Sequence, residues 1–332
     1  MRSERSKAAS TGRGEDGGRG QDGGRRDDSG WEVARPGNGV SVAGVRMAGF
    51  RDRDGAGLDK RVYAQPCVVV VIGLGEDPFL VEDGAGPHAL TGFAATFSPG
   101  PARVRGRHVE CVEMRLSPSA AYSLLGVSPG ELAAPVVSLE ELWGRSAQRL
   151  RGQLSESASW QQRLALMDEF LVARAARAPS MAPEVAAAWD HIVARRGRVR
   201  VDELAAPYGW SRKQLWSRFS AQVGLTPKRA AMLVRFDHAA RALCAGASAV
   251  DAATACGYVD QPHLHRDVRA FAGCTPGALA AHATTPDPHA EPPGRSPAHA
   301  DLPGRSSARA DALPRTSPRT PRSSSPTKGR SL

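Results

Sequence analysis

A pattern that occurs twice in the C-terminal third of the chain constrains the fold more than any other feature. Each copy predicts a short helix, a turn at glycine, and a longer helix whose apolar residues lie four positions apart. The first copy comprises Ala205, Tyr208–Trp210, Leu215, Phe219 and Gly224–Pro227, and the second comprises Ala253, Cys256–Tyr258, Leu264, Val268 and Gly273–Pro276. The offset is 48 residues before the turn and 49 after it. Two such copies predict two helix-turn-helix units.

The segment between the two units sets the distance between them. Residues from Pro227 to about Ala245 are predicted to form one helix, about 28 Å long at 1.5 Å per residue. Successive major-groove faces on one side of B-DNA lie about 34 Å apart. The second helix of each unit is therefore expected to enter one of two neighbouring grooves of a single duplex.

The charge of the chain is concentrated in this same segment. The whole chain has a net charge of +10 at pH 7, and residues 195–281 contribute +7 of it, whereas residues 37–194 contribute −2. A compact segment with this charge favours a polyanion as partner. A basic surface that only keeps the domain soluble is the alternative that charge alone leaves open.

The stretch GYVDQPHLHRDVRAFAGCTP, residues 257–276, is rich in histidine and aspartate, which suggests a metal site or a catalytic cluster. On a helix, however, His263 and His265 point about 200° apart around the axis, so they cannot bind one ion together. Asp260 is expected to cap the helix. The residues left for its outer face are Gln261, His263, Arg266 and Arg269. Gln can read adenine and Arg can read guanine through paired hydrogen bonds.

The rest of the chain divides by composition into a middle domain and two tails. Strand patterns over residues 61–74, 79–83, 89–97 and 108–116 are followed by helical patterns, so residues 37–177 are expected to be a small β-structure with trailing helices. Ser117 is predicted to cap the first of these helices. Residues 178–283 form the second domain, which makes the fold class α+β. Residues 1–36 and 284–332 have too few apolar residues to fold, and we expect them to be disordered.

The cysteines and the N-terminus indicate where the chain resides. Five cysteines occur without a CxxC pair, no apolar signal segment is visible, and no run is long enough to span a membrane. These features favour a reducing cytoplasm with free thiols, and no membrane partner. No phosphate-binding loop, nucleophile elbow or metalloprotease motif is present, so we expect neither a cofactor nor an enzyme.

Residues from about Pro183 to Ala283 resemble the DNA-binding domain of the AraC/XylS family of transcription regulators. The resemblance is carried by LAAPYGWSRKQLWSRFSAQVGLTPKRAAMLVRFDHAARAL and by DAATACGYVDQPHLHRDVRAFAGCTPGAL. It implies double-stranded DNA as partner, with RNA polymerase as a possible second one. Residues 114–144 resemble the effector or dimerisation half of some members, which is a reduced cupin-like β-structure. A homodimer through this half and a small-molecule effector of unknown identity are further possibilities.

The resemblance also implies which side chains face the DNA. By position, the first reading helix presents Ser211, Arg212, Lys213, Trp216, Ser217 and Arg218, and the second presents Gln261, His263, Arg266 and Arg269. Ser217 stands where the family usually has arginine, and Val268 stands where it usually has phenylalanine. Packing beside Leu215 is the alternative for Trp216. Contact with phosphate alone is the alternative for Arg212 and Arg218.

Two other functions stay open at this point. The first is a DNA-repair or thiol enzyme fused to a DNA-binding module, with Cys67 and Cys111 as candidate nucleophiles, although both lie in strand patterns typical of buried cysteines. The second is a ligand sensor with a metal in its cupin-like half, for which His88 and His108 are candidates. These histidines lack a paired spacing on one strand, which favours ordinary surface or core roles.

Overall fold

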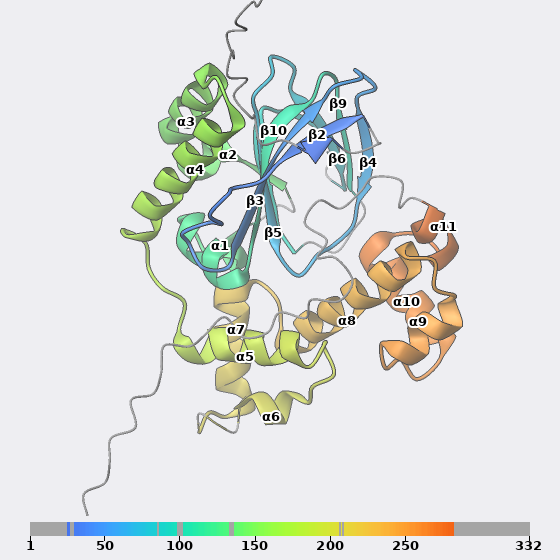
Figure 1. The fold of residues 1–332 in the computed structure, drawn as a ribbon. Helices are drawn as coiled ribbons and strands as arrows, with labels where there is room; N and C mark the ends of the chain where they lie inside the picture. Colours follow the sequence, from blue (N-terminus) through green and yellow to red (C-terminus); the bar gives the residue numbers. More distant parts are fainter. Residues whose placement is uncertain are drawn as a thin grey trace, which may run out of the picture. The chain divides into compact units, whose positions relative to one another are not determined.

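The computed structural model describes residues 25–26, 30–84, 86–97, 102–132, 136–205, 207 and 209–281. It has antiparallel sheets in its N-terminal part and helices in its C-terminal part, which confirms the α+β class (Figure 1). Most of the predicted tail 1–36 and all of the tail 284–332 lie outside the described residues. The prediction that residues 1–36 are disordered is wrong for Trp31–Ala34. This segment is a strand, because it pairs with Gly49–Asp52 in a sheet.

The strands of the N-terminal part form two antiparallel sheets. The first has the order β1-β2-β3-β10-β5-β8-β11 and the second has the order β4-β9-β6-β7. Their bounds are β1 Arg25–Arg26, β2 Trp31–Ala34, β3 Val45–Asp52, β4 Leu58–Val62, β5 Val68–Gly73, β6 Phe79–Asp83, β7 Gly86–Leu90, β8 Gly92–Ala95, β9 Ala102–Gly106, β10 Glu110–Leu116 and β11 Val136–Ser138. The sequence predicted strands near β4 to β8 and at β10, and it missed β1, β2, β3, β9 and β11.

The first sheet is buried on both faces, which explains the continuous apolar run in β5. Val68, Val70 and Ile72 point into the cluster that contains the helices, whereas Val71 points towards Phe79 of the second sheet. Successive side chains of a strand alternate between faces, so a strand with two buried faces needs apolar residues at every position. This run places β5 in the interior of the sheet, between β10 and β8.

Four helices and one 3₁₀ turn accompany these sheets. They are α1 Pro118–Leu124, η1 Pro129–Glu131, α2 Leu139–Trp143, α3 Arg145–Glu156 and α4 Trp160–Ala175. Ser117 caps α1 as predicted, since its hydroxyl accepts a hydrogen bond from the backbone N–H of Ala120 at 3.2 Å. Glu110 on β10 binds both Arg51 of β3 and Arg163 of α4, which fastens α4 to the sheet.

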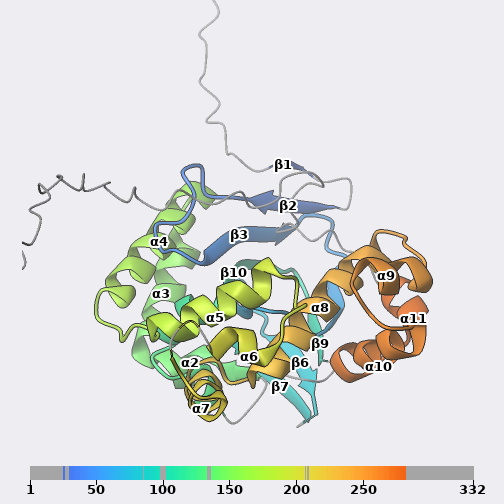
Figure 2. The same ribbon diagram turned by 90° about the horizontal axis from the view of Figure 1, so that it is seen from below.

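The C-terminal part contains seven helices in the described residues. They are α5 Pro183–Ala194, α6 Val201–Ala205, α7 Arg212–Val223, α8 Pro227–Cys244, α9 Ala249–Ala255, α10 Gln261–Ala272 and α11 Pro276–Ala281. Figure 2 shows α8 running from the group of α5, α6 and α7 to the group of α9, α10 and α11. The predicted stripes are buried: Leu215, Phe219 and Val223 in the first unit, and Leu264 and Val268 in the second.

Two of the contacts between the sheets and the helical part reach different helix-turn-helix units. The hydroxyl of Ser128, just before η1, donates to the carbonyl of Ala221 on α7. At the second place, the N–H of Ala64 donates to the carbonyl of Phe271 on α10 at 3.2 Å, and the ring of Tyr63 meets that of Phe236 at 5.8 Å. Each helix-turn-helix unit therefore has its own contact with the N-terminal part.

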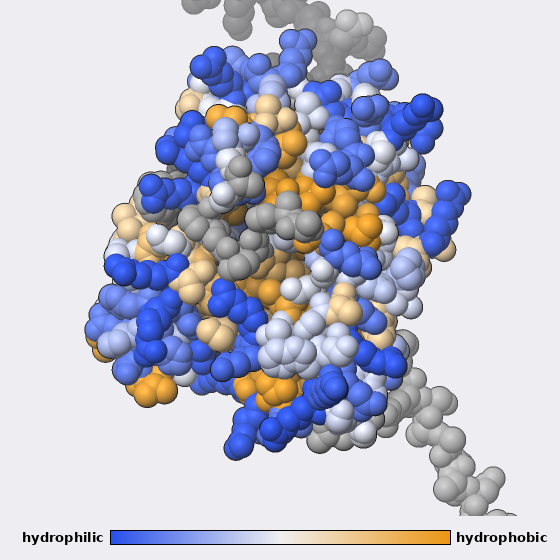
Figure 3. Space-filling view, turned by 180° about the vertical axis from the view of Figure 1, so that it is seen from behind, coloured by the Kyte–Doolittle hydropathy of each residue, from blue (hydrophilic) through white to orange (hydrophobic). Residues whose placement is uncertain are grey.

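The surface is mostly hydrophilic, with a limited number of exposed apolar groups. Figure 3 shows apolar residues gathered near the middle of one face, with hydrophilic residues around them. The large apolar side chains exposed in the described ranges are Val127, Val172, Val193, Trp216, Val250 and Val259. No helix in those ranges has the length and apolar character that crossing a membrane requires.

Candidate nucleic-acid interface

The start of α7 is fixed by a reciprocal cap. The hydroxyl of Ser211 accepts a hydrogen bond from the N–H of Gln214 at 3.2 Å, and the Gln214 side chain accepts one from the N–H of Ser211 at 2.9 Å. Gly224, in the left-handed conformation with φ 83°, ends the helix. Ser211 therefore has a defined role in beginning α7, which makes it a positioning residue for the side chains that follow it.

The outer face of α7 carries the side chains that the sequence indicated. Arg212, Lys213, Trp216, Ser217 and Arg218 are all exposed. Trp216 is 47% exposed, whereas its neighbour Leu215 is fully buried. The alternative of a Trp216 packed beside Leu215 is therefore not what the structure shows, and an aromatic ring is available on this face.

Two arginines of α7 have partners in the protein. Nη2 of Arg212 donates to Oδ2 of Asp202 on α6 at 2.6 Å. The guanidinium of Arg218 lies over the ring of Trp210, 5.2 Å from its centre. Both side chains are exposed, so these contacts hold the guanidinium groups in place without removing them from solvent.

The second reading helix, α10, begins at a cap of another kind. Oδ1 of Asp260 accepts a hydrogen bond from the N–H of His263 at 2.7 Å, as the sequence predicted, and Gly273 ends the helix with φ 66°. The exposed residues of its outer face include Gln261, Arg266 and Arg269. These three line an open groove of about 600 Å³ together with Pro262, His265, Thr275 and Pro276.

The two histidines of α10 are both half-buried and have different neighbours. His263 is half-buried, and its ring meets the Tyr258 ring edge-on at 5.3 Å. His265 lies on the groove side instead, with Nε2 3.3 Å from Nε2 of Gln261. Because Gln261 and His265 are four residues apart, they share one face of the helix, and this spacing could have identified His265. A DNA contact by His263 stays a prediction.

A buried polar cluster fixes α10 against α8, and sequence reasoning missed it. Asp267 is 3% exposed and accepts a hydrogen bond from Nη2 of Arg235 at 3.2 Å. The Arg235 guanidinium also lies 4.5 Å from the centre of the Tyr258 ring. Burial raises the pKa of the Tyr258 hydroxyl well above its usual range, so this ring stays neutral. An aspartate beside the apolar stripe of α10 was the available signal.

The thiols of the N-terminal part are poor nucleophiles. Burial raises the pKa of Cys67 to about 12, and it raises the pKa of Cys111 further still. A thiol that stays protonated at neutral pH lacks the thiolate that attacks an alkyl group. The proposed thiol enzyme therefore gains no support from its two candidate residues.

The histidines considered for a metal each lie near one aspartate. Nε2 of His88 lies 3.5 Å from Oδ1 of Asp83, and Nδ1 of His108 lies 3.6 Å from Oδ2 of Asp77. Within the residues that the structure describes, no three His, Cys, Asp or Glu side chains are grouped so that they could hold a metal ion.

Residues 204–282 match the family model described as a helix-turn-helix domain. This range contains both units that the structure shows and the helix that joins them. The chain is a DNA-binding transcription regulator with an AraC-type helix-turn-helix domain. No curated protein matches the chain as a whole or in part.

Several solved structures are similar to this regulator. ToxT from Vibrio cholerae is 9% identical over 73% of this chain and 100% of its own, with a TM-score of 0.45. An AraC-type regulator from Chromobacterium violaceum is 26% identical over 31% of this chain and 95% of its own, with a TM-score of 0.30. The AraC-like activator CuxR is 14% identical over 58% and 80%, with a TM-score of 0.24.

Proposed function

We propose that this regulator binds DNA by placing α7 and α10 in adjacent major grooves of one duplex. The observation that carries the proposal is the pair of capped, outward-facing helices at the two ends of α8. α8 has 18 residues and is therefore about 27 Å long. Successive major-groove faces are about 34 Å apart. Because the reading helices extend beyond the ends of α8, their separation can approach this distance.

The exposed side chains suggest a division of roles. Gln261 and Arg266 have the hydrogen-bonding groups that read adenine and guanine, and Trp216 offers an apolar surface suited to a thymine methyl group. Lys213 and Arg269 are proposed to contact phosphate, which adds affinity without specificity. Arg212, Ser217 and Arg218 are proposed to lie along the same groove, and Arg212 would exchange Asp202 for DNA.

The proposal is tested by selecting bound fragments from random duplex DNA with the full chain. The expected result is a motif of two blocks that are one helical turn apart. Arg266→Ala should relax base preference at one position of one block, at a cost of about 1–3 kcal/mol, and Trp216→Ala should affect the other block. Arg145→Ala on α3 removes the same charge far from both helices and is the matched control. A single block, or no enrichment, would refute the proposal.

Further features of the regulator are also proposed. Its DNA partner favours a cytoplasmic location, and contact with RNA polymerase would link DNA binding to transcription. The N-terminal part is proposed to form a homodimer or to receive a small-molecule effector, and the regulator is proposed to have no enzyme activity of its own. Sedimentation of the full chain, with and without DNA, distinguishes a monomer from a dimer, and a strict monomer on DNA would exclude the dimer.

A further inference from the structure

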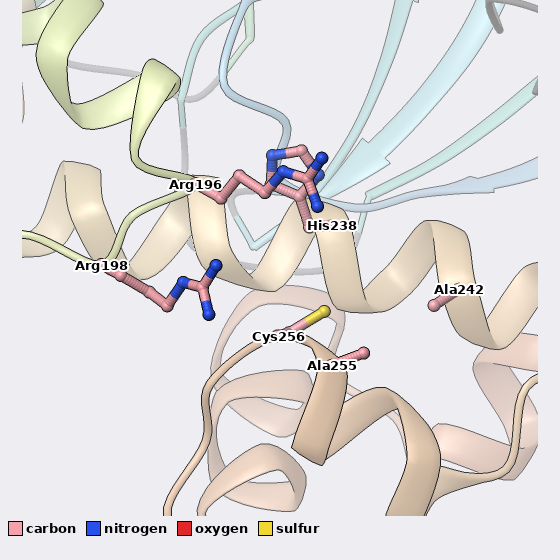
Figure 4. Close-up of a pocket in the computed structure, with 6 residues that line it drawn as sticks. All are labelled: Arg196, Arg198, His238, Ala242, Ala255 and Cys256. Carbon is pink, nitrogen blue, oxygen red and sulfur yellow. The ribbon is translucent and has the colours of Figure 1, made fainter. Parts of the chain in front are cut away.

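A small cavity lies between the two helix-turn-helix units, away from the reading faces. It has a volume of about 180 Å³ and is lined by Arg196, Arg198, His238, Ala242, Ala255 and Cys256 (Figure 4). The two arginines come from the connection between α5 and α6, His238 and Ala242 come from α8, and Ala255 and Cys256 come from the end of α9. Parts of both units and of the helix that joins them therefore meet at this cavity.

The cavity has an excess of positive charge. Within the described residues, no hydrogen bond or ion pair occupies the side chain of Arg196 or Arg198. The nearest acid on α8, Asp237, is buried and is already paired with Arg241 at 2.9 Å. Two exposed arginines thus line the cavity, neither paired with an acid among the residues that the structure describes, and their planar forks suit the oxygens of phosphate.

The backbone is shaped to bring these groups together. Arg196 has φ 52°, a left-handed conformation that costs a residue with a side chain on the order of 1 kcal/mol. The side chain of Arg198 lies across Gly257, where a Cβ atom would be only 2.6 Å from its Cδ. Arg198 therefore reaches from the first unit over the turn of the second. The same left-handed residue, Arg196, ends α5, where the N–H of Gly197 donates to the carbonyl of Ile192 at 2.8 Å.

The other lining groups suit an anion rather than a metal or an electrophile. Burial lowers the pKa of His238; the charge of Asp237 opposes this shift, whereas the charges of Arg241, Arg196 and Arg198 act in the same direction as burial. The imidazole is therefore neutral at neutral pH and can donate one N–H to a ligand. Burial raises the pKa of Cys256 above its usual value, so the thiol does not supply a competing negative charge.

We propose that this cavity binds a phosphate group through Arg196, Arg198 and His238, and so joins the two units across α8. The volume of about 180 Å³ has room for one such tetrahedral group in a cavity that both arginines line. The phosphate belongs either to a free phosphate or phosphate ester or to the backbone of the bound duplex. Both sources present the same phosphate oxygens to the cavity. They are distinguished by whether a bound duplex prevents free phosphate from binding there.

The test uses inorganic phosphate and the full chain labelled at histidine, at constant ionic strength set with chloride. The signal of His238, assigned by its loss in His238→Gln, should shift saturably, and its pKa should rise because a negative charge is now beside it. Arg196→Gln and Arg198→Gln should each weaken binding at least about tenfold. Arg195→Gln has the same charge change on an exposed neighbour that does not line the cavity, and it should leave binding unchanged.

A saturating duplex then identifies the source of the phosphate. If a backbone phosphate fills the cavity, added phosphate no longer shifts His238, and Arg198→Gln lowers the slope of log K against log salt by about 1. If a free phosphate fills it, the shift persists on DNA and the slope is unchanged. A response that does not saturate, or that is equal in Arg198→Gln and Arg195→Gln, overturns the site. Because the first titration contains no DNA, this failure is distinct from a failure to bind DNA.

Discussion

The fixed length of α8 leads to a prediction about operator geometry. Buried residues occur along α8 from Pro227 to Leu243, so the helix is packed over its whole length and cannot extend. At about 27 Å it holds α7 and α10 at one separation. Changing the length of the DNA between the two blocks of the operator should therefore weaken binding, whatever the sequence of the inserted base pairs.

Two insertions distinguish a rigid spacer from a flexible one. Five base pairs turn the second block about half a helical turn away from α10. Ten base pairs return it to the same face but move it by about 34 Å, more than the length of α8. We expect both insertions to remove the DNA contacts of one helix-turn-helix unit, because after either insertion α7 and α10 cannot reach both blocks at the same time.

The size of the loss follows from the exposed side chains of α10. Gln261 and Arg266 can make about two base contacts and Arg269 about one phosphate contact, and each lost base contact costs about 1–3 kcal/mol. The affinity should therefore fall by about 3 kcal/mol or more, which is about a hundredfold or more. Fluorescence anisotropy with the full chain at one fixed salt concentration measures it, and an operator with altered bases but unaltered length is the control. Recovery of full affinity with ten added base pairs would refute the rigid spacer.

The remaining predictions concern stability and the contact between the two parts. Phe271→Ala should lower the free energy of unfolding by about 3–5 kcal/mol, because the ring is 1% exposed and stacks on Phe236 at 5.1 Å, and urea unfolding measures this. Burial opposes ionisation of Glu110, but the hydrogen bonds from Arg51 and Arg163 outweigh it and lower its pKa. Glu110→Gln should therefore be less stable than the natural chain at neutral pH, with a difference that disappears as the pH falls through the lowered pKa; a constant difference would contradict this. Gly130→Val should open the contact of η1 with α7, because a Cβ there lies 2.8 Å from two α7 carbonyls, and faster proteolysis between α4 and α5 reports it, with Gly152→Val as control.

The sequence predicted the C-terminal part well because the signals there are local. The caps at Ser211 and Asp260, the terminal glycines, and the apolar residues four positions apart each act within one helix, and the structure has helices at these places. The side of α10 that each histidine faces was harder to predict. The ring of His263 contacts the ring of Tyr258, and this contact depends on how the turn between α9 and α10 places the Tyr258 ring.

The sequence did not predict those strands that form because they pair with a neighbouring strand and that lack an apolar pattern of their own. β3 contains Arg46, Gly49 and Arg51, which interrupt any apolar pattern. It forms because β10 pairs with it along seven residues and β2 pairs with its far end. Glu110 also neutralises Arg51 from the neighbouring strand. Such partners are 59 residues apart in the chain, so no local window contains the information.

The contacts between the two parts were also beyond the sequence, and they bear most on regulation. η1 holds the end of α7, where the Ser128 hydroxyl bonds to the Ala221 carbonyl, while the N–H of Ala64 bonds to the carbonyl of Phe271 on α10. The N-terminal part therefore contacts both reading helices separately, in addition to their connection through α8. A ligand of the N-terminal part could change DNA binding only by favouring one arrangement of these two contacts over another, because equal affinity for both arrangements shifts nothing. Loosening either contact should then alter how an effector acts more than it alters which bases are read.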